Sequence, residues 1–381
     1  MTDVLIVGAG PAGSLAAIAL ARAGVHVTLL DRATFPRDKL CGDSVNPGAM
    51  AVLARYGLAS AVEQRGLPIR GMRLTGPRGV TIEGHYPYGV YGRSILRRDL
   101  DALLLEAAAD AGARVELGVR VTGALLAGVN GHARVCGVRI GGDGRTQERR
   151  AGVVIAADGR GSVLARALGL AHHPRRPRRW AIGAYFEQVA DMAPVGEMHV
   201  RAGHYIGVAP VPGGLTNACL VVPEAIARGE ARAPAAALDR ALAADRGLAD
   251  RFGRARRVSR PVVLGPLAVD ASVAGIDGLL LAGDAAGFVD PMTGDGIRIA
   301  LTGGELAAAA AVESLQGRPD AHLRLARRRH EVFGVKLRTN RLLRTLVSRP
   351  SGVASAARLA RIWPSVFRRL LDYAGDVPQS V

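Results

Sequence analysis

The chain has 381 residues, of which 49% are hydrophobic and 22% are charged. This composition excludes a disordered chain, and the length predicts two lobes rather than one domain of ordinary size. No apolar run reaches the roughly 20 residues that span a bilayer, and no basic segment typical of a signal peptide opens the sequence, so we predict a cytoplasmic protein.

The formal net charge of +17 comes almost entirely from arginine, since only Lys39 and Lys336 are lysines. We do not expect nucleic-acid binding, because the chain has no recognised module and its arginines do not alternate with aromatic residues. Residues 318–349 hold ten basic side chains against two acidic ones, which predicts a basic segment in peripheral contact with an anionic membrane. Three widely separated cysteines indicate neither a disulfide scaffold nor a metal site.

The first 31 residues predict a complete βαβ unit, with a strand at 4–7, a helix at 14–22 and a strand at 25–30. A Gly-x-Gly-x-x-Gly turn in this context binds the pyrophosphate of a dinucleotide, because glycine allows close approach and the helix N-terminus favours negative charge. Asp31 is expected to accept hydrogen bonds from a ribose, and its charge argues against a 2′-phosphate. The predicted dinucleotide contacts here are Gly8, Gly10, Pro11, Ala12, Gly13, Asp31 and Arg32.

The later elements alternate between two patterns. Helices are predicted at 48–57 and 98–111, and strands at 114–119, 121–127, 133–140 and 153–156. Successive strands at 180–189, 196–201, 204–211 and 215–222, with one helix at 233–246, predict an inserted antiparallel sheet. A buried strand at 279–282 and an Ala-rich helix at 296–316 then return to the first pattern.

We therefore predict an α/β fold: a doubly wound, Rossmann-like dinucleotide-binding domain with an inserted antiparallel β-sheet domain and a helical C-terminal tail. The first domain is assigned to residues 1–75, 93–172 and 266–318. The inserted, substrate-binding domain is assigned to residues 76–92 and 173–265, and the basic helical tail to residues 319–381.

Three further motifs accompany predicted strand ends or helix starts. Gly283-Asp284 follows the strand at 279–282, Asp158-Gly159 follows the strand at 153–156, and Arg97-x-x-Leu-Asp begins the helix at 98–111. Together with the Gly8–Gly13 turn, and in their order along the chain, they resemble the signatures of the family that contains geranylgeranyl reductases and aromatic hydroxylases. The resemblance implies FAD as the cofactor. Further FAD contacts are expected at Arg97, Asp158, Gly283, Asp284, Pro291, Gly294, Gly296 and Ile297.

One segment narrows the resemblance to the reductases. Residues 36–42, Pro-Arg-Asp-Lys-Leu-Cys-Gly, are similar to the Pro-x-x-Lys-x-Cys-Gly segment of geranylgeranyl reductases. The Gly-Glu-Ser and Trp-x-Trp-x-Ile-Pro motifs typical of flavin-dependent halogenases are absent from the sequence. The similarity implies that Lys39, Cys41 and Gly42 border the flavin, with Cys41 close to the reacting double bond.

The inserted domain departs from the reductase pattern. Geranylgeranyl reductases carry a Tyr-x-Trp-x-Phe-Pro stretch that grips the prenyl chain, and this chain keeps Tyr205 and Pro210 of that stretch. Gly207 and Ala209 stand where the two rings are expected. Their small size opens space, so the substrate is expected to be bulkier, ring-containing or branched.

We infer an FAD-dependent oxidoreductase that reduces, or oxidises, carbon–carbon double bonds of a hydrophobic isoprenoid or polyketide-like molecule by hydride transfer at flavin N5. Cys41, His204 and Tyr205 are the candidate catalytic proton donors. NAD(P)H is expected to reduce the flavin transiently, because no second nucleotide-binding domain is evident. Two alternatives remain open. One is a monooxygenase that hydroxylates an aromatic or polyketide substrate through C4a-hydroperoxyflavin, and the other is a non-catalytic, lipid-binding flavoprotein.

Overall fold

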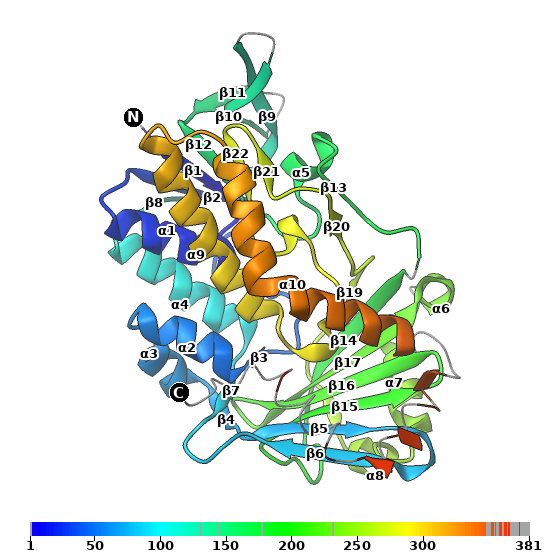
Figure 1. The fold of residues 1–381 in the computed structure, drawn as a ribbon. Coiled ribbons are helices and arrows are strands. Elements are labelled where there is room, and N and C mark those ends of the chain that lie inside the picture. Colours follow the sequence, from blue (N-terminus) through cyan, green and yellow to red (C-terminus); the bar gives the residue numbers. More distant parts are fainter. Residues whose placement is uncertain are drawn as a thin grey trace.

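The first domain is built around a six-stranded sheet, shown in Figure 1 in a computed structural model of the chain. The structure describes residues 2–129, 132–142, 145–176, 178–230 and 232–347, and a few separate residues after them. In spatial order the strands are β21 (Gly275–Ile276), β22 (Leu279–Leu281), β12 (Val153–Ala156), β1 (Val4–Val7), β2 (Val27–Asp31) and β8 (Arg114–Leu117). Neighbouring strands are parallel except β21 and β22. Burial on both faces explains why the inner strands are short apolar runs.

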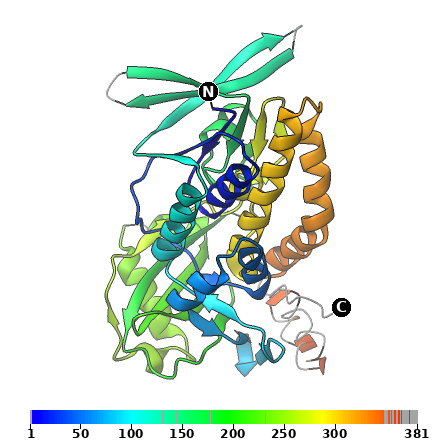
Figure 2. The same cartoon turned by 90° about the vertical axis from the view of Figure 1, so that its left-hand side faces the viewer.

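Alternate residues of the central strands enter two separate hydrophobic cores. In β1, Val4 and Ile6 pack toward helices, whereas Leu5 and Val7 pack toward a three-stranded sheet. The helices are α1 (Pro11–Arg22), α2 (Pro47–Arg55), α3 (Ala59–Arg65), α4 (Arg97–Asp110) and α9 (Gly296–Leu315). The opposite face carries β9 (Val121–Val129), β10 (His132–Gly142), β11 (Arg145–Arg150) and α5 (Val163–Ala167), and the small sheet reaches beyond the domain in Figure 2. The predicted Rossmann-like α/β class is confirmed, with a β-layer covering the second face.

The second domain is an eight-stranded sheet. In spatial order its strands are β18 (Arg256–Arg257), β14 (Arg179–Glu187), β17 (Leu215–Pro223), β16 (His204–Val211), β15 (Gly196–Arg201), β5 (Gly71–Thr75) and β6 (Thr81–His85), with β19 (Val262–Leu264) paired to β14. The pairs are antiparallel except β15 with β5. The sequence assigns residues 71–75 to the first domain, but their pairing as β5 places them in this sheet. Helices α6 (Glu224–Glu230), α7 (Pro234–Ala244) and α8 (Ala249–Phe252) cover one face, which leaves the other toward the first domain.

Short elements connect the two domains. β3 (Ser44–Val45), β7 (Gly92–Ser94) and β4 (Leu67–Ile69) form one small sheet, and β13 (Ala171–His172) pairs with β20 (Asp270–Ala271). Three single turns of 3-10 helix are η1 (Pro77–Gly79), η2 (Gly283–Ala286) and η3 (Pro291–Thr293). Both η2 and η3 lie on the segment between β22 of the first sheet and α9.

Helix α10 (Ala321–Val347) runs along α9 and then turns toward the second domain (Figure 1). Near its end, Arg344 donates a hydrogen bond to the carbonyl of Val289 (3.4 Å), and the carbonyl of Arg344 accepts one from Arg179 of β14 (3.5 Å). The predicted helical tail is therefore present as α10, while most of residues 348–381 lie outside the described residues. Within the described ranges, no helix is both long and apolar enough to cross a membrane.

Close packing of α1 against α9 depends on a glycine in α9. A Cβ atom on Gly304 would lie 2.2 Å from the carbonyl oxygen of Ala12, far inside van der Waals contact. Because the glycine turn starts α1, the distance between these helices also fixes where that turn meets the end of β22.

We predict that Gly304→Ala destabilises the fold by about 1–3 kcal/mol, because α9 must move away from the backbone of α1. Gly229→Ala in α6 is the matched control, since a Cβ there meets no atom within 4 Å and alanine favours a helix by up to about 1 kcal/mol. Urea unfolding of both variants measures the difference. Equal stability of the two would show that α1 and α9 are not held at this distance.

Candidate active site

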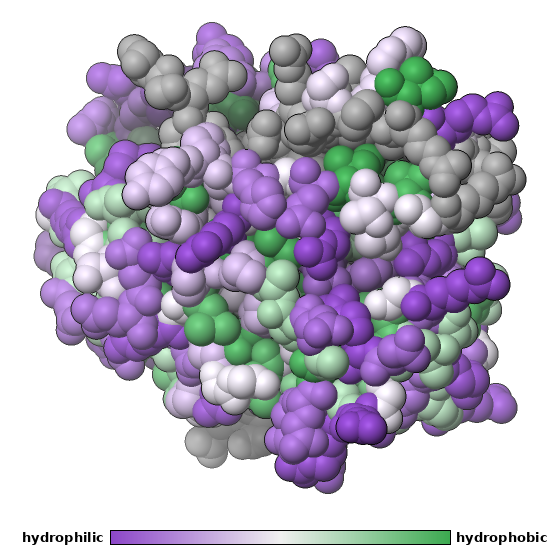
Figure 3. Space-filling view, turned by 90° about the horizontal axis from the view of Figure 1, so that it is seen from below, coloured by the Kyte–Doolittle hydropathy of each residue, from purple (hydrophilic) through white to green (hydrophobic). Residues whose placement is uncertain are grey.

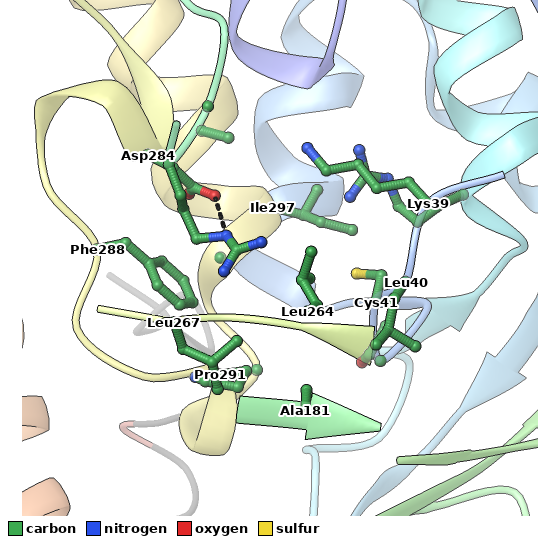
Figure 4. Close-up of a pocket in the computed structure, with 18 of the residues that line it drawn as sticks. Lys39, Leu40, Cys41, Ala181, Leu264, Leu267, Asp284, Phe288, Pro291 and Ile297 are labelled. Carbon is green, nitrogen blue, oxygen red and sulfur yellow. Dashed lines mark ion pairs between the residues drawn. The ribbon is translucent and has the colours of Figure 1, made fainter. Parts of the chain in front are cut away.

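A cavity of about 190 Å³ lies between the glycine turns of the first domain and the inner face of the second sheet (Figure 4). Segments distant in sequence meet around it. The predicted site residues that line it are Gly10, Pro11, Ala12, Lys39, Cys41, Gly42, Arg97, Tyr205, Gly283, Asp284, Pro291, Gly294, Gly296 and Ile297. The second sheet and the segment after β19 supply a largely apolar wall of Ala181, Met198, Gly207, Val221, Leu264 and Leu267. The cavity thus places a polar, glycine-rich wall opposite an apolar one.

The glycine turn has the geometry that a pyrophosphate requires. Gly8 has φ +101°, and a Cβ on Gly13 would lie 1.8 Å from the carbonyl oxygen of Gly8. Gly10 lines the cavity, and a Cβ on it would fill part of the cradle. Helix α1 begins directly at Pro11, so its free amides face the same place.

Five predicted contacts do not line the cavity: Gly8, Gly13, Asp31, Arg32 and Asp158. Asp31 Oδ2 accepts a hydrogen bond from the amide of Ala9 (2.8 Å), which ties the turn to the end of β2. Asp158 Oδ2 accepts one from the amide of Val163 (2.8 Å), while its Oδ1 is buried with no partner in the described chain. Arg32 is exposed. The predicted ribose contact of Asp31 stays a prediction.

Three cations and one carboxylate line the cavity. Burial lowers the pKa of Lys39, the charge of Arg97 adds to this effect, and Lys39 makes no hydrogen bond within the described residues. Arg160 lies 4.0 Å from Asp284, and burial lowers the pKa of Arg160 although Asp284 opposes the shift. This excess of positive charge suits a cofactor that carries a pyrophosphate and becomes anionic when reduced, so the residues present fit FAD.

Arg97 is held in place by a buried ion pair. Its guanidinium donates two hydrogen bonds of 2.9 Å to Asp101, one turn further along α4. Burial lowers the pKa of Arg97, but Asp101 and then Cys41 raise it, so the net shift is upward and the charge is permanent. Arg37, which the sequence motifs do not single out, also lies 3.2 Å from Asp101 and 4.0 Å from Asp31. Its position beside the glycine turn suits a phosphate contact.

A buried hydrogen-bond cluster supports Cys41, and the sequence motifs did not predict it. Asp43 Oδ2 accepts hydrogen bonds from Tyr185 Oη (2.8 Å) and Asn217 Nδ2 (2.6 Å), and Asp43 Oδ1 accepts one from the amide of Arg97 (3.1 Å). Asn217 Nδ2 also donates to the carbonyl of Cys41 (2.6 Å). Cys41 lines the cavity and points into it from the same side as Lys39 (Figure 4). The cluster therefore fixes the backbone of Cys41 against the second sheet.

The cluster holds Asp43 at an energetic cost. The side chain is fully buried, and its backbone is in the left-handed region with φ 52°. Burial raises the pKa of Asp43 to about 6, although the hydrogen bonds from Tyr185 and Asn217 oppose the shift. Burial also raises the pKa of the neighbouring Cys219 thiol to about 12, and Cys41 and Asp43 add to that shift.

Tyr205 and His204 point to opposite faces of β16. Tyr205 lines the cavity, but its hydroxyl donates a 2.6 Å hydrogen bond to Asp290 Oδ1, and burial raises its pKa well above the usual value. His204 lines a different cleft of about 920 Å³ beside α7, which is larger but contains none of the glycine turns. The position of His204 does not fit its predicted role as a proton donor at this site. Strand alternation explains the error, because the side chains of adjacent residues in a strand point to opposite faces of the sheet.

Comparison with known proteins places the chain among flavoproteins. Residues 1–332 match a family described as FAD binding domain. The menaquinone reductase of Mycobacterium tuberculosis is 34% identical over 324 residues, which cover 80% of this chain and 75% of that protein. Digeranylgeranylglycerophospholipid reductase 1 of Methanopyrus kandleri is 33% identical over 336 residues, covering 82% of this chain and 81% of that protein.

A solved structure shares the fold. The myxobacterial chondrochloren halogenase CndH, an FAD-dependent enzyme, superposes with a TM-score of 0.83 over 97% of this chain and 91% of its own, at 24% identity. At this identity the likeness concerns the fold alone. The sequence relatives, in contrast, are named as reductases.

We predict that Asp43→Asn stabilises the protein at pH 7.5. The pKa of Asp43 is raised from 3.8 to about 6, so the charged form opposes folding by an amount that grows between these pH values and persists above them. The shift corresponds to a destabilisation of the folded state by about 3 kcal/mol, which the neutral Asn side chain removes. The substitution also removes the acceptor for the Arg97 amide, which costs about 1 kcal/mol of stability. A net gain of about 2 kcal/mol is expected.

Thermal unfolding between pH 4 and pH 8 measures this effect, and the gain of Asp43→Asn must shrink as the pH falls toward the unfolded-state value. The exposed Asp239→Asn in α7 is the control and leaves the profile unchanged. A loss of stability at pH 7.5 in Asp43→Asn would show that the charged carboxylate contributes favourably to the fold.

Proposed function

The chain belongs to the FAD binding domain family, and on this basis we propose that it reduces carbon–carbon double bonds of an isoprenoid lipid. It is an FAD-dependent oxidoreductase of the geranylgeranyl reductase-like group. The names of two of its relatives, menaquinone reductase and digeranylgeranylglycerophospholipid reductase, both refer to molecules with prenyl chains. The apolar wall of the second sheet, directly opposite Cys41 and the glycine turns, is the observation that carries the proposal.

One wall of the cavity would hold the cofactor, and the other would hold the lipid. FAD, when bound, supplies the hydride to the substrate. The Gly8–Gly13 turn and the start of α1 would hold its pyrophosphate, and Asp284 its ribityl hydroxyls. The amides that open α9 at Gly296 and the cations Lys39 and Arg160 would balance negative charge on the ring. Leu264, Val221 and their neighbours exclude water from the face where the lipid lies.

Cys41 is the proton donor that the geometry favours. Its side chain reaches the cavity, and the permanently charged guanidinium of Arg97 beside it would stabilise the thiolate left after proton transfer. Tyr205 is less suitable, because its hydroxyl proton is engaged by Asp290 and its pKa is raised. NAD(P)H is proposed as the transient donor that reduces the flavin from the open side of the cavity.

Anaerobic flavin oxidation tests this function. Chemically reduced holoenzyme is mixed, without oxygen, with geranylgeranyl glyceryl ether or with its fully saturated counterpart, and flavin absorbance is followed by stopped flow. We expect the unsaturated lipid, but not the saturated one, to oxidise the flavin. In Cys41→Ala the rate of this flavin oxidation is expected to fall by roughly 10²-fold or more. Oxidation by neither lipid, together with rapid reaction with oxygen in the presence of an aromatic substrate, would contradict the proposal and support a monooxygenase.

We also propose that the outer side of α10 rests on an anionic membrane surface, where such a lipid would be found. Val332, Val335 and Leu342 are exposed there beside the exposed Arg338 and Arg341. This mixture of apolar and basic side chains is typical of a helix that lies on a lipid headgroup layer. In contrast, the coloured surface in Figure 3, at the end of the second domain, is mostly hydrophilic and shows only small hydrophobic areas.

Replacing both Arg338 and Arg341 by Glu is expected to weaken binding to phosphatidylglycerol vesicles by roughly 30-fold or more, since each basic residue contributes about 1 kcal/mol. Replacing the exposed Arg114 and Arg150 by Glu is the matched control, because these residues lie on the first domain far from α10. Vesicle co-sedimentation at low and high salt measures both. Equal binding by the two double variants would contradict the proposed membrane surface.

A further inference from the structure

A second, smaller cavity of about 90 Å³ adjoins the active-site cavity on the side away from the glycine turns. We call it the methionine cavity, because Met72, Met198 and Met292 line it, three of the six methionines in the chain. The two cavities share seven wall residues. These are Gly42, Ser44, Met198, Gly207, Cys219, Pro291 and Gly294. These shared residues form the partition between the two cavities.

Strand β16 contributes a glycine to this partition. Tyr205, Gly207 and Ala209 occupy alternate positions of β16 and so face the same side of the sheet. Tyr205 lines the active-site cavity, Ala209 lines the methionine cavity, and Gly207 lines both. A Cβ on Gly207 would meet only Cys219 O at 3.9 Å and Met198 Cε at 4.0 Å. A larger side chain there would grow into the passage rather than into the packed core.

The remaining wall of the methionine cavity does not call for a polar ligand. Three of its polar side chains are already engaged by the protein: Asn46 accepts from the amide of Ala49, Asn217 donates to Asp43, and Glu197 accepts from Arg251. No buried polar atom that lacks a partner in the described chain lies on this wall. Ile69, Val208 and the methionines form the rest, and methionine adapts its shape to flexible apolar groups.

We propose that the methionine cavity binds the part of the isoprenoid chain that lies beyond the reacting double bond, and that Gly207 is the residue that lets the chain pass. This inference rests on the proposed function. Met198 is the movable side of the passage, since its terminal methyl group is the nearest side-chain atom to Gly207. The chain length of the substrate is then selected beyond the flavin cavity.

Two variants and two lipid probes test the proposal. Gly207→Leu narrows the passage, and Met72→Trp fills the far end of the methionine cavity without touching the active-site cavity. Geranyl and geranylgeranyl glyceryl ethers, with two and four prenyl units, are titrated into oxidised holoenzyme, and binding is read from flavin fluorescence. Both variants are expected to weaken binding of the geranylgeranyl ether by about tenfold or more. Met72→Trp is expected to change binding of the geranyl ether by less than about twofold, because Met72 does not line the active-site cavity. Gly207→Leu is expected to weaken the geranyl ether less than the geranylgeranyl ether.

Retained flavin absorbance and an unchanged melting temperature show that the variants are folded. If the variants bind both probes equally more weakly, or bind both as tightly as the wild type, the role of the methionine cavity is overturned. Binding of the probes to the wild-type enzyme would still support the proposed function in that case. Failure of both probes to bind the wild-type enzyme overturns the proposed function and this inference with it. Selective loss of the long probe in both variants establishes the subsite.

Discussion

The buried carboxylate of Asp43 is the constraint on which the geometry of the site depends. It accepts hydrogen bonds from elements of both domains: the start of α4 at Arg97, β14 at Tyr185 and β17 at Asn217. Through Asn217 the same cluster holds the carbonyl of Cys41. Burial of the charge and a left-handed backbone both oppose folding, so the residue is placed where function rather than stability favours it.

Once Asp43 has fixed the Cys41 segment against the second sheet, the two walls of the cavity acquire different chemistry. One wall consists of glycine turns, helix N-termini and three cations, and it suits an anionic dinucleotide. The other consists of the apolar inner face of a sheet, and it suits a lipid. The small residues Gly207 and Ala209 extend this second wall toward the methionine cavity. On the proposed function, the fold would bring FAD and an apolar chain together in this cavity.

Local sequence patterns predict the first domain well, because each βαβ element and each glycine turn lies within about 30 consecutive residues. They fail where distant segments meet. Asp43 is 142 residues from Tyr185 and 174 from Asn217, and no local signal joins them. The pairing of β5 with β15 is likewise non-local. The chemistry of His204 predicts a proton donor, but strand alternation directs its side chain to the opposite face from Tyr205.

The most direct test of the account is the mass of the product formed by reduced enzyme from geranylgeranyl glyceryl ether in the presence of NADPH. The account predicts a gain of two hydrogens for each reduced bond, and in deuterated water at least one of the two is deuterium, delivered through the exchangeable thiol of Cys41. A product that has gained one oxygen atom from molecular oxygen, with every double bond retained, would contradict it.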